Sequence, residues 1–367
     1  MPILKQASSR RRNRGGDFLA VLLLLAIIVG TGWLWWHEKH PKKPEKHKPV
    51  VVASAVVPTP VRPVEKPKPR PLVMVAETTN AFSRPVRDVF EAQVALARRA
   101  VSPGSIDGAI GSQTRAAIAA FQRSQNLFVS SALDTNTRAQ LTLDAPLLTD
   151  YIVTTNDLTR LQPLGRTWLA KSEQSALDYE TILELVAERG HAHPLLIQRL
   201  NPEVSWTNVM AGTVLKITAV NYPEPDGKAA FIVIHLSEKF LEAFDAETNL
   251  LVHFPCSIGA RFDKRPVGEL KVKAIAPNPN YTFDPAVFPE SPEAQAIGHK
   301  LILPPGPNNP VGVAWIGLDK PGYGMHGTPV PEQVGRTESH GCFRLANWDA
   351  EYLVKLVWIG MPVEVEP

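Results

Sequence analysis

An uncharged run of 19 residues limits what the first part of the chain can fold into. The run FLAVLLLLAIIVGTGWLWW covers residues 18–36, about the length that a helix needs to cross a hydrocarbon core of roughly 30 Å. Five basic residues precede the run. Three tryptophans lie at its C-terminal end, which favours an aromatic belt at a membrane interface there. Basic residues on one flank stay cytoplasmic, so we expect a cytoplasmic tail at 1–17 and a single-pass anchor at 18–36.

The alternative for this run is a cleaved signal peptide. Its length exceeds a usual signal core, and no small-x-small cleavage site follows it. The anchor is therefore the preferred interpretation. It predicts a protein of the inner (cytoplasmic) membrane with its later domains in the periplasm or cell-wall space.

The residues after the run are rich in lysine and proline. The chain has 34 prolines, and they are dense from residue 37 to about residue 71, where they favour extended polyproline conformations over helix or sheet. Residues 37–83 are predicted to be a disordered linker.

Charge and cysteine content exclude several function classes. The net charge is +3, but residues 1–70 hold 14 of the 39 Lys and Arg and 4 of the 36 Asp and Glu. The remainder is acidic, which argues against a nucleic-acid partner. The two cysteines, Cys256 and Cys342, are too few for a disulfide scaffold or a CxxC site. We expect Cys256 to be a buried strand residue and Cys342 to be a free thiol.

The segment HGTPVPEQVGRTESHGCFRL, residues 326–345, carries the candidate chemistry. A cysteine nucleophile needs a base, a group that orients the base, and donors for an oxyanion. His326 is a candidate base for Cys342, and the Gly327 carbonyl a candidate orienter. The polar, glycine-bearing turn before Cys342 favours an exposed elbow over a buried cysteine. An imidazole beside the thiol would stabilise the thiolate as an ion pair. We expect neither a metal nor a cofactor, because zinc would consume the thiolate.

Residues 84–146 predict a small three-helix domain. Apolar stripes mark the first two helices, Ser112 is the expected N-cap of the second, and Asp134 caps a short third helix. The phrase DGAIGSQTRAAIAAFQ resembles the peptidoglycan-binding domain 1 family. A generic helical spacer is the alternative.

Residues 147–222 predict an α+β module. Two helical pieces, YETILELVAERG and PLLIQRLNP, precede a strand after Gly212, and residues 151–153 are the expected first strand. This order resembles a LysM glycan-binding module. The stretch LTRLQPLGRTWLAKSEQ is longer than the turn that this family uses.

Residues 229–367 contain many short runs of branched and aromatic residues and one late helix with Asn347 as its expected cap. This pattern predicts a mainly-β domain, a sandwich or barrel-like sheet. The proline-rich segment 277–310 is too long for a simple connector and predicts a lid or binding wall. Its Tyr281 and Phe283, with Trp315, are expected either to line a groove or to pack the segment down.

The HGT and S-x-G-C phrases together resemble the catalytic domain of the L,D-transpeptidase (YkuD, or ErfK–YbiS-type) family. The resemblance implies that Cys342 is the nucleophile, that His326 is the base held by Gly327, and that His340 is an auxiliary. It gives the N–H groups of Gly341 and Cys342 to the oxyanion. Arg344 adds positive charge beside Cys342 and could hold a substrate carboxylate bidentately, and Ser339 and Tyr323 are further candidates for substrate binding.

The activity that this resemblance implies is cross-linking of peptidoglycan. Cys342 would form a thioester with a stem peptide, D-Ala would leave, and an amine of a second stem would resolve the thioester. Water or a protein lysine as acceptor would give carboxypeptidase or protein-anchoring activity instead. A wall-binding tether with an inert catalytic domain is the non-enzyme alternative. Stem peptides, glycan and the membrane are the expected partners.

Overall fold

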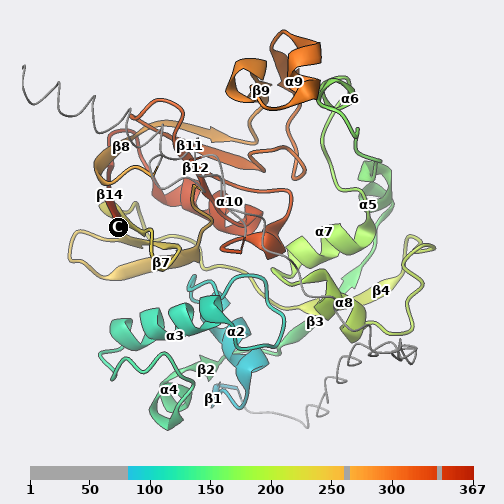
Figure 1. Cartoon of the computed structure of the whole chain (residues 1–367). Coiled ribbons are helices and arrows are strands. Elements are labelled where there is room, and N and C mark those ends of the chain that lie inside the picture. The colour runs from blue at the N-terminus through green and yellow to red at the C-terminus, as the bar shows by residue number, and fades with distance from the viewer. Residues whose placement is uncertain (1–81, 260–264, 337–340) are drawn as a thin grey trace, which may run out of the picture. The chain divides into compact units, whose positions relative to one another are not determined.

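The computed structural model describes residues 82–259, 265–336 and 341–367, which belong to one compact unit (Figure 1). The predicted cytoplasmic tail, anchor and most of the linker lie outside the described residues, as do Ser339 and His340. No helix within the described ranges has the length and apolar character to cross a membrane.

Residues 84–143 form the predicted helical domain. Its helices are α2 (Val89–Ala97), α3 (Ser112–Ser124) and α4 (Thr135–Gln140), and a short antiparallel pair, β1 (Arg84–Pro85) and β2 (Thr142–Leu143), closes it. Asp134 caps α4 as predicted. The prediction for Ser112 is wrong by one residue, because Gly111 takes the extended N-cap conformation and Ser112 is the first helical residue. Leu96, Ile118 and Phe121 are buried in the core.

The next module has the order strand, helices, strand. It consists of β3 (Leu148–Ile152), α5 (Thr155–Arg160), α6 (Trp168–Ser172), α7 (Ile182–Arg189), α8 (Pro194–Leu200) and β4 (Val214–Thr218). β3 and β4 pair antiparallel. The long stretch noted in the sequence folds into α5 and α6, each capped by a threonine hydroxyl. Its LysM character stays a prediction.

The remaining residues build one curled sheet of eight strands. In chain order these are β5 (Phe231–His235), β6 (Phe240–Phe244), β7 (Leu250–Pro255), β8 (Gly268–Pro277), β11 (Ala314–Leu318), β12 (Gly324–His326), β13 (Phe343–Arg344) and β14 (Pro362–Glu366). Their order in the sheet is β13-β12-β11-β8-β14-β5-β6-β7. Mainly-β content is confirmed.

The expectation of a two-sheet sandwich is corrected by this strand order. β14 pairs with β5 on one side and with β8 on the other, and β8 pairs in turn with β11. Both halves are therefore hydrogen-bonded into a single sheet. The helix α10 (Asn347–Leu356) packs against the sheet through Ala350 and Leu353, which are buried in the same core as Ile316 and Met325.

The segment 277–310 is ordered by a small core of its own. It contains β9 (Tyr281–Phe283), a 3₁₀ turn η2 (Pro285–Val287), α9 (Pro292–Ile297) and β10 (Leu301–Leu303), and β9 pairs with β10. Phe283 is fully buried there and Trp168 of α6 stacks on it at 4.5 Å between ring centroids. We refer to residues 277–310 as the lid segment.

Candidate active site

Strand register brings the candidate catalytic residues to one face of the sheet. β12 and β13 run parallel, with Met325 opposite Phe343 and His326 opposite Arg344. Side chains alternate between the two faces of a strand. Phe343 is fully buried in the core, so Arg344, the next residue of β13, points to the other face together with His326. Cys342 directly precedes this strand.

The His326 imidazole is held in a defined tautomer. Its Nδ1 lies 2.7 Å from the Gly327 carbonyl oxygen. A carbonyl can only accept, so Nδ1 carries the proton and Nε2 keeps a lone pair. The ring stacks against Trp315 at 5.5 Å, and its burial lowers the His326 pKa to about 4. The imidazole is neutral at neutral pH and able to accept a proton.

Gly327, the predicted orienter, is fixed by a residue that the sequence did not single out for the site. A Cβ on Gly327 would lie 2.3 Å from Oδ1 of Asn347. That oxygen accepts from the Thr328 N–H at 3.0 Å. Asn347 is the first residue of α10, and Ala346 is the N-cap, so its predicted capping role is wrong. Its buried amide instead holds the chain that follows His326.

The two cysteines are both free. Cys256 follows β7 and is fully buried. The Cys342 thiol is partly exposed and donates to the Gly322 carbonyl at 3.4 Å. Burial raises the pKa of Cys342, against smaller opposing effects of the Gly324 N–H and of Arg344.

The resting state of the pair therefore differs from the expected one. With the thiol pKa raised and the imidazole pKa lowered, both groups are neutral at neutral pH. The preformed thiolate–imidazolium ion pair expected from the sequence is replaced by a neutral pair, because burial disfavours both charged forms. A neutral imidazole whose Nε2 keeps a lone pair has the form that a general base needs.

The turn before Cys342 depends on glycine. Gly341 has φ +151°, and Gly259 approaches it so closely that a Cβ on Gly259 would lie 3.1 Å from the Gly341 Cα. The Tyr323 ring also approaches Gly341. One of its carbons lies 3.3 Å from the position that a Cβ on Gly341 would take. Tyr323 is thus beside the nucleophile turn. The oxyanion role of the Gly341 N–H stays a prediction, as do the roles of Ser339 and His340, which lie outside the described residues.

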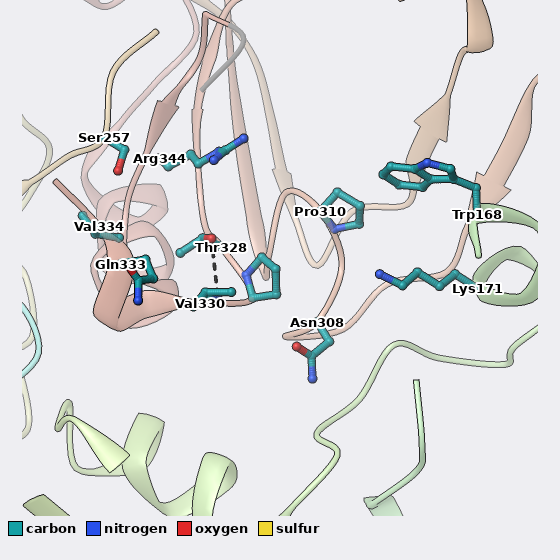
Figure 2. A pocket seen from close by; sticks show the side chains of 11 residues that line it. Trp168, Lys171, Ser257, Asn308, Pro310, Thr328, Val330, Gln333, Val334 and Arg344 are labelled. Atoms are coloured by element: carbon teal, nitrogen blue, oxygen red, sulfur yellow. Dashed lines mark hydrogen bonds between the residues drawn. The ribbon is translucent and has the colours of Figure 1, made fainter. Parts of the chain in front are cut away.

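Arg344 opens toward a cavity of about 380 Å³ (Figure 2). Ser257 pairs with Arg344 through two backbone hydrogen bonds of 2.8 and 3.0 Å, which fix the strand below the guanidinium. Cys342 and His326 do not line this cavity, which adjoins the reacting groups through Arg344. Burial raises the pKa of Tyr281, with a smaller effect of Cys342 in the same direction and an opposing effect of Arg344, so this lid residue lies within electrostatic range of both. Phe283 and Trp315, by contrast, pack into their surroundings.

Two segments of the chain match known families. Residues 229–365 match the L,D-transpeptidase catalytic domain, and residues 86–141 match a peptidoglycan binding domain. The chain therefore carries an L,D-transpeptidase catalytic domain behind a peptidoglycan binding domain, as the two motif resemblances predict.

Individual proteins that are similar to this chain carry L,D-transpeptidase names. A Bacillus licheniformis protein named as the L,D-transpeptidase YkuD is 26% identical over 51% of this chain and 94% of its own length. An Escherichia coli K12 protein named as the L,D-transpeptidase YbiS is 31% identical over 45% of this chain, and the match spans only 53% of that protein. The solved structure of L,D-transpeptidase 3 from Mycobacterium tuberculosis covers 44% of this chain and 77% of its own, at 18% identity and a TM-score of 0.29.

Proposed function

We propose that this chain is a membrane-anchored cysteine L,D-transpeptidase that cross-links peptidoglycan stem peptides. The observation that carries the proposal is the register of β12 and β13, which sets an oriented, neutral His326 opposite Arg344, two residues after Cys342. The names of the relatives support the substrate class.

The first half of the reaction is acylation. The Cys342 sulfur attacks the carbonyl between the third stem residue and the terminal D-Ala, while Nε2 of His326 takes the thiol proton. The oxyanion formed is stabilised by backbone N–H groups of the turn at Gly341. His326 then gives its proton to the departing amine, so that D-Ala leaves and a thioester remains.

The second half is transfer to an amine. The side-chain amine of a second stem attacks the thioester, His326 takes its proton, and the thiolate is released and reprotonated. Water competes with the amine at this step, so a covered site favours transfer over hydrolysis. We expect the lid segment, whose Tyr281 lies within electrostatic range of Cys342 and Arg344, to cover the site.

The other modules bring the enzyme to its polymer. The peptidoglycan binding domain at 86–141 would bind the wall. The LysM-like module would bind glycan, and the run 18–36 would anchor the chain in the inner membrane with the folded part outside the cytoplasm. The proline-rich linker would then provide the reach to the wall.

The test uses the full chain in detergent with a disaccharide-tetrapeptide, and mass spectrometry of the products. We expect loss of D-Ala, a cross-linked dimer, and a covalent adduct on Cys342 after exposure to a carbapenem. Cys342→Ala should abolish all three by removing the only accessible thiol among the described residues.

The controls separate the competing activities. Cys256→Ala should leave dimer formation intact because this thiol is fully buried away from solvent. Loss of D-Ala without a dimer, even at high amine concentration, would make the chain a carboxypeptidase. Wall binding with neither adduct nor D-Ala release would make it a tether.

A further inference from the structure

The cavity beside Arg344 is built by two modules. The catalytic domain contributes Arg344, Ser257 and Thr328, whereas Trp168 and Lys171 come from α6 of the preceding module. Figure 2 shows Lys171 extending from α6 into this space, across from Arg344. The catalytic domain alone therefore does not enclose the groove that leads away from its own arginine.

α6 is held in place by the lid segment. Trp168 stacks on Phe283 at 4.5 Å and on Phe288 at 6.0 Å, and its backbone N–H donates to Glu293 at 2.5 Å. One turn of helix separates Trp168 from Lys171, and the Lys171 Nζ lies 5.8 Å from the Trp168 ring. The ammonium is thus attached to a packed element and not to a loose loop.

A second anchor fixes the floor between the two cations. Asn308 lines the cavity, and its side-chain amide donates to Glu184 at 2.6 Å and to the Asp178 carbonyl at 3.0 Å. Its backbone N–H donates to the Leu177 carbonyl at 2.9 Å. These bonds join the lid segment to the preceding module, so that Lys171 and Arg344 keep a fixed relation.

The charged groups around Lys171 favour binding of an anion only on the side of the lysine that faces Arg344. No carboxylate in the described part of the chain forms an ion pair with Lys171. A neighbouring cavity, which Lys171 and Asn308 also border, is acidic through Glu180, Glu184 and Glu332 and would repel an anion. The space between Lys171 and Arg344 has two cations and no acidic side chain among its lining residues.

We propose that Lys171 is a specificity-determining residue that binds a carboxylate of the peptide substrate, in a groove completed by the module that precedes the catalytic domain. The proposal rests on the proposed function and adds the recognition of an acidic peptide. Arg344 binds one carboxylate of the peptide near Cys342. Lys171 binds a second carboxylate farther along the same peptide.

The first experiment measures peptide binding to the full chain with Cys342→Ala, so that no turnover is needed. Calorimetry with a tetrapeptide carrying free carboxylates is compared with the same peptide amidated at those positions. Lys171→Met should weaken binding of the free-carboxylate peptide about fivefold, a typical contribution of one partly exposed ion pair. It should leave binding of the amidated peptide unchanged, and Lys171→Arg should restore affinity.

Lys216→Met is the matched control. It removes one lysine from the same module, at a surface ion pair with Asp150 away from the cavity, and should leave binding unchanged. Equal losses for free and amidated peptides, no loss with Lys171→Met, or no binding at all to Cys342→Ala would each overturn the proposal.

The second experiment assigns the carboxylate to the donor or the acceptor stem in the active full chain. An effect on the donor appears as a raised KM for D-Ala release with unchanged kcat. An effect on the acceptor appears as a lower ratio of dimer to hydrolysed product. Binding that depends on Lys171 without any D-Ala release would refute the proposed function and leave the carboxylate site standing.

Discussion

At the scale of single residues, burial favours the uncharged forms of both candidate catalytic groups. His326 is 5% exposed and its pKa is about 4, and burial raises the pKa of Cys342. The thiol therefore gains nucleophilicity only when a base accepts its proton during attack. A resting thiol of this kind is also less prone to oxidation than an exposed thiolate.

This arrangement predicts the pH dependence of acylation. A group with a lowered pKa stays neutral down to that lower value, so His326 remains a base well below pH 6.5. The rate of carbapenem adduct formation on Cys342, followed by intact-mass spectrometry, should be nearly constant from pH 7 to pH 5. It should fall about tenfold for each unit below pH 4, as protonated imidazole accumulates.

The same measurement on Asp226→Asn, an exposed position, should give the same profile. A decline centred near pH 6.5 would mean that the working imidazole is solvated. That result would contradict the prediction that Cys342 and His326 are both neutral at neutral pH.

The motif names His326 and Cys342 as candidate reacting residues, and their roles stay predictions. The contacts that surround them could not be predicted from the motif. His326 and Cys342 belong to one short motif, and the spacing within the motif indicates their chemistry. Asn347 and Trp315 act through contacts that only the folded chain creates: Asn347 reaches Thr328 and Trp315 stacks on His326. Neither contact leaves a local signal, because the partners are set by strand pairing and helix packing. The roles of Ser339 and His340 stay predictions.

At the scale of elements, the lid segment and α6 depend on each other. The small core under the lid consists of Leu177, Phe283, Ala294, Leu301 and Leu303, with Trp168 packed against it. This cluster is separate from the core of the catalytic sheet. The lid can therefore loosen without unfolding of the sheet.

Trp168→Ala should open the lid locally. Removal of a half-buried indole that stacks on two phenylalanines should lower the local opening free energy by about 2 kcal/mol, which is about thirtyfold in amide exchange. Hydrogen exchange by mass spectrometry should show this change at β9 and β10 and not at β5 or β6. In the same variant, hydrolysis should increase relative to transfer.

Leu169→Ala provides the comparison, because Leu169 is the next residue of α6 and is 46% exposed. It should leave exchange at β9 and β10 unchanged. If the two variants behaved alike, the lid would not depend on the Trp168 stack.

Most strands could be predicted from sequence, and the way they assemble could not. The expected late helix beginning near Asn347 is α10, and the runs of branched and aromatic residues contain strands such as β8, because strand-like and helical patterns are local. Strand order depends on pairing between residues far apart, so local patterns left a sandwich and a barrel-like sheet as alternatives and could not give the single curled sheet. α6 was missed because its five residues are stabilised by packing against the lid.

At the scale of the whole molecule, a buried carboxyl joins all three modules. Asp349 of α10 accepts hydrogen bonds from Tyr222 at 2.5 Å and from Ser102 of the helical domain at 3.2 Å. Asp349 is 1% exposed, and burial raises its pKa to about 7. The native protein thus holds this proton more tightly than the unfolded chain does.

The pH dependence of stability follows from the sign of this shift. Asp349 contributes stability that is fully present below its unfolded pKa of 3.8 and is lost as pH rises through about 7. Asp349→Asn should remove this contribution, changing the slope of the unfolding free energy between pH 5 and 7 by about 1.4 kcal/mol per unit. Denaturant unfolding at several pH values measures the slope.

Asp245→Asn, in the turn that joins β6 to β7, is the control. Hydrogen bonds from Asn249 lower the pKa of Asp245, so this carboxyl titrates below the measured range and its replacement should leave the slope between pH 5 and 7 unchanged. A slope unaffected by Asp349→Asn would show that the carboxyl is ionised in the native protein.

The place of β14 in the sheet has a consequence for the order of events during synthesis. Residues 362–366 are translated after every other strand of the sheet, yet they lie between β8 and β5 and alone connect its two halves. A nascent chain that has passed Cys342 still lacks the strand that unites the domain. Cys342 is therefore synthesised before the strand that completes the sheet around it.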